Sequence, residues 1–329
     1  MKRTVFFKNA PRIVGVSSVG GPKECAGCIG DRIEIKLSDD KFGEKSFEQA
    51  ESKILYTAIK NAIHNAGRKE ADVDVILAGD LLNQIISATF AARNFSTGYL
   101  GLYTACATFT QSILTGGALI DGGYVKNAVC ATSSHFSSAE RQYRYPLELG
   151  STRPPQAQWT VTGAGALVIS NKGKGPKVTG GTIGRVVDYG VTDVNNMGAA
   201  MAPAAADTLY THFIESGKTP ENYDMIVTGD LGALGSRLLK DLLWEKGYDV
   251  NKNHVDCGEI IYNISEKEFQ GGSGAGCSSL VFCAYLYEKL LNKKIDKMLF
   301  AATGALLSSV SSGQGESIPA IAHAVSIEA

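Results

Sequence analysis

The stretch that decides the fold runs from Ala71 to Leu81 and reads Ala-Asp-Val-Asp-Val-Ile-Leu-Ala-Gly-Asp-Leu. A second stretch, from Glu221 to Leu231, reads Glu-Asn-Tyr-Asp-Met-Ile-Val-Thr-Gly-Asp-Leu, with each residue 150 positions after its counterpart. Both contain a short apolar run that predicts a buried strand ending in Gly-Asp-Leu. Because matches at a fixed offset indicate repeated units, this pair predicts a duplication.

Two further matches occur in the same order along the chain. Cys106 corresponds to Cys277, and Thr132 corresponds to Thr303, both at an offset of 171 residues. A weaker match sets the segment beginning at Arg12 against the one beginning at Lys177. Insertions between the blocks account for the changing offset. The chain is therefore predicted to consist of two halves, 1–172 and 173–329, which meet in a Gly- and Lys-rich linker.

The order of elements within each half indicates an α/β fold. Short apolar strands alternate with amphipathic helices, which is typical of largely parallel sheets covered by helices on both faces. The helix expected before Gly67 has an apolar stripe, and Gly67 itself is a typical helix stop.

Composition narrows the classes of function. The 329 residues include 32 Lys and Arg against 33 Asp and Glu, and the resulting net charge of −1 argues against nucleic-acid binding by phosphate neutralisation. No run approaches the roughly 18 apolar residues of a membrane-spanning helix, and the first residues do not form a secretory signal. We therefore expect a soluble chain.

Seven scattered cysteines predict reduced thiols rather than a disulfide framework. Cys25 and Cys28 form one CxxC pair, but no second pair accompanies it, so a surface loop is expected in place of a metal or redox site. The sequence predicts neither a metal nor a cofactor, and its glycine clusters do not form a phosphate-binding motif.

Cys106 is the candidate nucleophile. It falls between a predicted strand end and the start of a helix, where the helix dipole favours a thiolate. Cys277 occupies the matching place in the second half, so position alone leaves open whether Cys106 is functional or is a small packing residue.

A catalytic cysteine also needs a base within hydrogen-bonding reach. Among the five histidines, His135 follows the strand ending at Thr132, on the side where parallel sheets bind ligands. His323 lies in an apolar stretch and is expected in the core. The three other histidines are expected on helix surfaces or in a polar loop.

The segment after His135 is rich in arginine and aromatic residues. These residues could bind a planar carboxylate through arginine and stack on an aromatic ring: Arg141, Tyr143, Arg144, Tyr145, Arg153 and Trp159. An equally open alternative is a surface loop whose arginines pair with Glu140 and Glu148.

A duplicated α/β unit with a cysteine at a helix start, followed by Gly163-Ala-Gly-Ala-Leu-Val, resembles the thiolase and ketoacyl synthase superfamily. Within it, long runs resemble the stage V sporulation protein AD family, among them Gly101-Leu-Tyr-Thr-Ala-Cys, Gln158-Trp-Thr-Val-Thr-Gly and Gln314-Gly-Glu-Ser-Ile-Pro. The resemblance implies a thiolase-like fold, an αβαβα sandwich of two similar halves.

The same resemblance implies a role in moving dipicolinic acid, with calcium, into the developing spore and out again at germination. It also implies partners among the other proteins of a spore membrane complex and a peripheral place at the spore inner membrane. A homodimer is a further possibility.

The sequence departs from condensing enzymes of the ketoacyl synthase III type at two motifs. Where those enzymes have His-Gln-Ala-Asn this chain has Gly229-Asp-Leu-Gly, and where they have Gly-Asn-Thr-Ser it has Gly271-Gly-Ser-Gly. Replacement of both catalytic groups implies a protein that binds without catalysis, since such groups act as a unit. The expected ligand-binding residues are Cys106, His135, Arg141, Trp159, Gly229 and Gly272.

Two alternatives remain. An acyltransferase or hydrolase could use Cys106 with His135 or His323 as a recruited base, or the chain could be a scaffold that binds no ligand.

Overall fold

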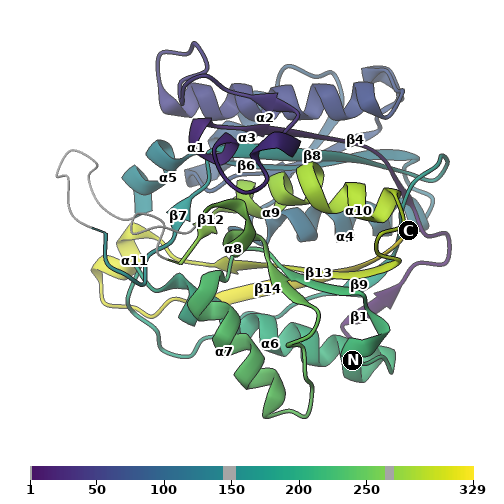
Figure 1. Cartoon of the computed structure of the whole chain (residues 1–329). Helices are drawn as coiled ribbons and strands as arrows, with labels where there is room; N and C mark the ends of the chain where they lie inside the picture. The colour runs from purple at the N-terminus through teal and green to yellow at the C-terminus, as the bar shows by residue number, and fades with distance from the viewer. Residues whose placement is uncertain (1, 144–152, 264–269) are drawn as a thin grey trace.

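The computed structural model describes residues 2–143, 153–263 and 270–329. Its layers alternate between helices and sheets (Figure 1). Helix α2 (Phe47–Asn65) covers one sheet, helices α6 (Met197–Ser216) and α7 (Gly232–Trp244) cover the other, and α4 (Thr108–Asp121) and α9 (Ala275–Val281) lie between the two sheets. This is the αβαβα sandwich implied by the resemblance.

Each sheet is built mainly from one half of the chain. The first contains, in spatial order, β2 (Arg12–Gly20), β8 (Gly163–Ser170), β6 (Asn127–Ser134), β4 (Val75–Gly79) and β5 (Gly98–Gly101). The second contains β9 (Lys177–Thr182), β14 (Ala320–Glu328), β13 (Lys297–Ala305), β10 (Met225–Thr228) and β11 (His254–Asp256). A single pair of residues, Arg12 and Lys177, links β2 to β9.

The remaining elements lie at the margins. Strand β1 (Thr4–Phe6) pairs with β9, β3 (Ile35–Lys36) pairs with β2, and β7 (Trp159–Thr160) pairs with β12 (Gly272–Ser273). The short helices are α1 (Pro22–Cys25), α3 (Ile86–Ala92), α5 (Phe136–Tyr143), α8 (Cys257–Ile261), α10 (Tyr287–Leu291) and α11 (Ser309–Gly313).

The prediction of largely parallel sheets was wrong for part of each sheet. Strands β4, β5 and β6 are parallel, as are β10, β11 and β13, but β8 and β14 run antiparallel to both of their neighbours. Within the described residues, only α5 and β7 lie between β6 and β8, and only α11 lies between β13 and β14. Without a crossover helix the chain returns beside the strand it has left, and the pair is antiparallel.

The repeated sequence blocks occupy equivalent places. The two Gly-Asp-Leu segments lie at the ends of β4 and β10; Cys106 lies two residues before α4, and Cys277 lies in the first turn of α9. Gly67 and Gly217 follow α2 and α6 with left-handed φ angles of 64° and 68°, as expected of helix stops. The linker at 171–176 joins β8 to β9, and the boundary after residue 172 remains a prediction.

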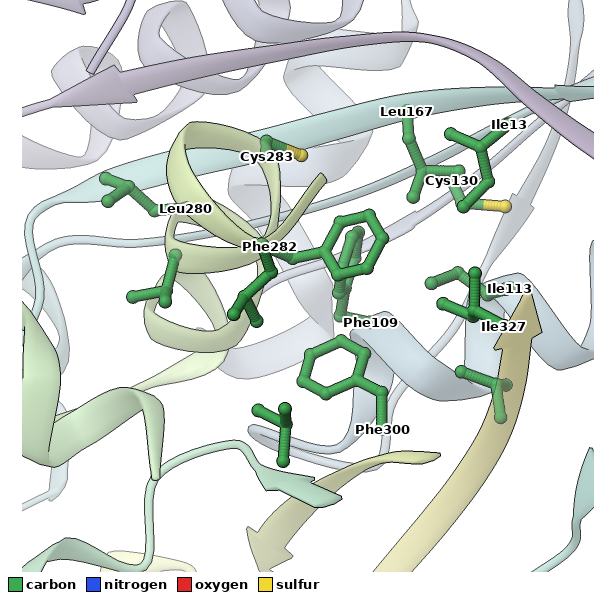
Figure 2. Packing of buried hydrophobic residues seen from close by; sticks show 14 of the residues in the cluster. Ile13, Phe109, Ile113, Cys130, Leu167, Leu280, Phe282, Cys283, Phe300 and Ile327 are labelled. Carbon is green, nitrogen blue, oxygen red and sulfur yellow. The ribbon is translucent and has the colours of Figure 1, made fainter. Parts of the chain in front are cut away.

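The central helices are packed from both sides. Phe109 of α4, Phe282 of the π-helical turn Phe282–Leu286 that follows α9, and Phe300 of β13 are all fully buried and meet as one aromatic cluster (Figure 2). The rings of Phe282 and Phe300 stack with their centroids 5.4 Å apart, and Phe109 contacts both edge-on. Helix α4 packs on β14 and β13 of the second half, while α9 packs on β8 and β6 of the first. The two halves therefore share one interior.

None of the helices within the described residues is long and apolar enough to span a membrane.

Candidate functional site

Cys106 lies in a tight turn between β5 and α4. The preceding residue, Ala105, has a left-handed φ of 50°, which is uncommon for a residue with a side chain and is found at functional sites. Thr108 holds this turn: its hydroxyl donates to the Ala105 carbonyl at 2.7 Å and accepts from the Thr104 amide at 3.0 Å. Gly304 of β13 passes so close that an added Cβ would lie 2.2 Å from the Thr104 carbonyl. The backbone of this turn is therefore held from both sides.

The Cys106 side chain is 7% exposed and lines a small, mainly apolar pocket of about 40 Å³. A pocket of this volume holds only about one to three water molecules. Its walls come from the Cys106 turn, α5, β7, β12, the start of α6 and the end of β13, through Leu81, Tyr103, Ala105, Ala139, Glu140, Tyr143, Thr160, Met197, Ser273, Gly274, Ala305 and Leu307. Among the described residues that line it, Glu140 is the one ionisable group besides the thiol and the two tyrosines.

Cys106 and Cys277 have different environments. Cys277 is fully buried at the start of α9, does not line the pocket, and directs its thiol at the Gly229 carbonyl, 3.5 Å away. Burial raises the pKa of this thiol well above its usual value. Cys277 is therefore the packing residue of the pair, and Cys106 is the one that faces a cavity.

Glu140 forms a buried ion pair at the pocket wall. Its carboxylate accepts a hydrogen bond from the Thr160 hydroxyl at 2.8 Å and lies 3.3 Å from Arg153 Nη1. The Arg153 guanidinium also lies over the Trp159 ring, 5.3 Å from its centroid, and Trp159 stacks on Phe136 at 4.1 Å. Trp159 is thus part of an aromatic and cationic stack beside the pocket.

Of the arginine pairings in the surface-loop alternative, with Glu140 and Glu148, the described residues contain the one with Glu140. Arg153 pairs with Glu140, and Arg141 lies 3.6 Å from a Glu48 carboxylate oxygen. Arg144, Tyr145 and Glu148 lie outside the described residues.

His135 and Arg141 lie together, but away from the Cys106 pocket. His135 is fully buried, with Nε2 2.7 Å from the Asp40 carbonyl and Nδ1 accepting from the Ser137 amide. Both side chains contact the Phe47 ring of α2. Burial lowers the pKa of His135, so its ring is a neutral hydrogen-bonding group, and neither residue lines the pocket.

His323 does not line the pocket either. It lies on β14 at a separate surface hollow beside α4, where its Nδ1 accepts from the Gly184 amide at 3.1 Å. Burial lowers the pKa of His323 to about 4. No histidine is found among the described residues that line the Cys106 pocket.

Gly229 and Gly272 are in packed positions. A Cβ on Gly272 would lie 2.7 Å from a methyl carbon of Ile261, and one on Gly229 would lie 3.0 Å from the Ala302 backbone. Gln158 donates to the Gly272 carbonyl at 2.9 Å. Neither glycine lines the pocket, whose wall on this side is formed by Ser273 and Gly274.

Sequence reasoning missed the role of the aspartates in the two Gly-Asp-Leu segments. Asp80 is fully buried and accepts from the amides of Leu82 and Ala88, both at 2.7 Å. Asp230 is almost fully buried and accepts from the Gly274 amide at 2.9 Å and from the Thr303 hydroxyl at 2.8 Å. Asp80 therefore holds the chain that follows β4, and Asp230 holds Gly274 of the pocket wall next to β13. The repetition of an acidic residue directly after a buried strand was the available signal.

A second carboxylate supports the second half. Asp256 accepts from the Thr228 hydroxyl at 2.6 Å and from the amides of Leu231 and Gly232 at 2.9 and 3.0 Å. Burial raises the pKa of Asp256 to about 7. This network sets the path of the chain between β10 and α7.

The CxxC pair lies at the surface near α1. The Cys28 thiol is 2.9 Å from the Asn263 side-chain oxygen, and the Cys25 thiol is 3.3 Å from the Gly20 carbonyl. Among the described residues, no group of three or more His, Cys, Asp or Glu side chains is placed to hold a metal ion.

A duplicated αβαβα sandwich with a cysteine in the turn before the central helix defines a thiolase-fold protein. OleA from Xanthomonas campestris bound to cerulenin shares this fold, with a TM-score of 0.65 and 13% identity over 99% of this chain and 98% of that one. 3-Oxoacyl-[acyl-carrier-protein] synthase III from Aquifex aeolicus VF5 gives a TM-score of 0.57 and 14% identity over 97% of this chain and 100% of that one.

Sequence comparison is more specific. The family model described as "Stage V sporulation protein AD (SpoVAD)" matches residues 1–328. The stage V sporulation protein AD of Bacillus subtilis strain 168 is 41% identical over 327 residues, which are 99% of this chain and 97% of that protein. The chain belongs to the stage V sporulation protein AD family.

Proposed function

We propose that this thiolase-fold sporulation protein binds dipicolinic acid, free or as its calcium chelate, beside Cys106 without catalysing a reaction. In this role it takes part in uptake of the acid into the spore and in its release at germination. The observation that carries the proposal is the composition of the pocket: the cysteine is present, while its described lining contains neither a histidine nor an asparagine.

This composition favours binding over catalysis. A cysteine that forms covalent intermediates needs a base in reach, and catalytic residues that act as a unit lose most of their rate enhancement when one of them is removed. The alternative, an acyltransferase or hydrolase with a recruited base, is less well supported because the rings of His135 and His323 are hydrogen-bonded elsewhere and neither lines the pocket.

The ligand would enter from a larger groove of about 460 Å³, which shares Tyr103, Tyr143 and Leu307 with the lining of the Cys106 pocket. Ligand sites usually offer about 300 to 1,000 Å³, and the inner pocket has about 40 Å³, so binding next to Cys106 requires side chains to move. Of the six ligand-binding residues proposed from sequence, Cys106 lies at the pocket and Trp159 beside it. His135 and Arg141 would need a rearrangement to take part.

Titration calorimetry of the full chain with dipicolinate, with and without calcium, tests the proposal. We expect saturable binding in the micromolar to low millimolar range. Cys106→Phe, which fills the inner pocket, should abolish it, whereas Cys28→Phe at the exposed cysteine should not. Absence of saturable binding in the wild-type chain would refute the proposal. Acylation of Cys106 by an acyl thioester would favour the enzyme instead.

We further propose that the protein acts peripherally at the spore inner membrane, together with other proteins of the same membrane complex. Co-purification of those proteins with the tagged chain from sporulating cells is the expected result. A homodimer remains a proposal that light scattering of the purified chain can test.

A further inference from the structure

Two hollows adjoin at the Cys106 site. The inner pocket of about 40 Å³ contains the thiol, and an outer groove of about 460 Å³ lies next to it. The outer groove is lined by Leu82, Asn83, Gln84, Ile85, Leu306, Ser308 and Ser311. Three further side chains, Tyr103, Tyr143 and Leu307, line both hollows and therefore form the partition between them.

The two tyrosines of this partition are joined by hydrogen bonds. Tyr143, the last residue of α5, hydrogen-bonds through its hydroxyl to the Leu81 carbonyl and to the Tyr103 hydroxyl. Tyr103 is 43% exposed, whereas Cys106, three residues later, is 7% exposed. Solvent exposure therefore falls between Tyr103 and Cys106, because the two tyrosine side chains cover the inner pocket.

The opposite wall of the groove is held in place. Gln84 and Ile85 have left-handed φ angles of 58° and 46°, which cost free energy for any residue with a Cβ and most for a β-branched one. Asp80 secures this strained turn by accepting from the amides on both sides of it, at Leu82 and Ala88. Since the backbone of the turn at Gln84 and Ile85 is fixed, the inner pocket can open by rotation of the two tyrosine side chains about their χ angles.

We propose that Tyr103 and Tyr143 form a gate that determines which molecules reach Cys106. With the hydroxyls hydrogen-bonded, molecules larger than a few waters remain in the outer groove. When the pair separates, the inner pocket and the groove become one space large enough for an aromatic carboxylate. The inference rests on the proposed function for the identity of the ligand that passes, while the gate itself can be tested without that ligand.

The test measures alkylation of Cys106 in the full chain by peptide mass spectrometry, with iodoacetamide as the small reagent and fluorescein maleimide as the bulky one. Cys28, which is exposed, serves as the internal reference. In the wild type we expect iodoacetamide to modify Cys106 at least about tenfold more slowly than Cys28, and fluorescein maleimide to leave Cys106 largely unmodified.

Tyr143→Phe removes the hydroxyl that bonds to both Tyr103 and Leu81. Loss of these hydrogen bonds should raise the rate of Cys106 alkylation about fivefold to tenfold, with a larger increase for fluorescein maleimide than for iodoacetamide. A change in the intrinsic reactivity of the thiol would raise both rates equally, so the ratio of the two reports on the gate. Tyr124→Phe, at a tyrosine that is 81% exposed, is the matched control and should change neither rate.

Equal rates of Cys106 alkylation in the wild type and in a folded Tyr143→Phe variant would overturn the proposal. It would also be overturned if fluorescein maleimide modified Cys106 of the wild type as fast as it modifies Cys28. If Tyr143→Phe melts at a lower temperature, Tyr103→Phe, which removes one hydrogen bond alone, replaces it with the same expected direction. Faster alkylation without any dipicolinate binding would support the gate and refute the proposed function, so the two failures can be distinguished.

Discussion

Phe300→Ala should destabilise the whole molecule rather than one half of it. Phe300 is fully buried, stacks on Phe282 at 5.4 Å and contacts the edge of Phe109 at 6.1 Å, so its ring joins β13 to both central helices (Figure 2). Truncation of a buried phenylalanine costs about 3 to 5 kcal/mol through lost apolar burial and the cavity left behind. Since the free energy of unfolding of native proteins is about 5 to 15 kcal/mol, this loss is a large part of the total stability.

The measurement is urea-induced unfolding followed by far-ultraviolet circular dichroism and by tryptophan fluorescence. We expect the free energy of unfolding to fall by about 3 to 5 kcal/mol, with both signals changing in one shared transition. Phe6→Ala, at a phenylalanine that is 56% exposed, should change it by less than about 1 kcal/mol. A loss below about 1 kcal/mol for Phe300→Ala, or two separate transitions in the wild type, would refute the shared interior.

Two further predictions concern single positions. Burial raises the pKa of Glu24 to about 7 from 4.5, so the folded state takes up a proton that the unfolded state does not, and stability should decline by up to about 3 kcal/mol as pH rises from about 4.5 to 7. Glu24→Gln, which keeps an oxygen to accept from Tyr262 and Thr162, should flatten that decline in melting temperature, and an unchanged pH profile would contradict the assignment. Gly165→Ala should lower the free energy of unfolding by about 1 to 3 kcal/mol because its Cβ would lie 2.1 Å from the Ser279 carbonyl, whereas Gly313→Ala, with nothing within 4 Å, should be neutral. Equal melting temperatures for these two variants would show that α9 can move away from β8.

The fold could be predicted from the sequence because its signals are local and repeated. The two Gly-Asp-Leu segments and the two cysteine blocks each combine a buried strand or helix with the turn that follows, and these patterns depend on neighbouring residues. Strand direction was harder to predict. The antiparallel course of β8 and β14 goes with connections whose described residues contain no long crossover helix, and no apolar pattern marks that choice.

The site was predicted less completely, for a similar reason. Cys106 was found because a cysteine at a helix start has a recognisable local pattern. His135 follows its strand as expected, but Phe47 and Asp40, about 90 residues earlier in the chain, determine where its ring lies. The partition around Cys106 likewise combines Tyr103, Tyr143 and Leu307 from three separate parts of the sequence, so no single stretch could indicate it.

The packing of the central helices against both sheets has a consequence for synthesis. Helix α4 belongs to the first half, yet one of its faces packs on β13 and β14, which lie close to the end of the sequence. At about 5 to 20 residues per second, a ribosome needs roughly 10 to 40 s to make the intervening 200 or so residues. For that time the face of α4 that packs on β13 and β14 lacks these native partners. A nascent first half should therefore depend on chaperones, and removal of β13 and β14 should leave a chain that aggregates instead of a smaller folded domain.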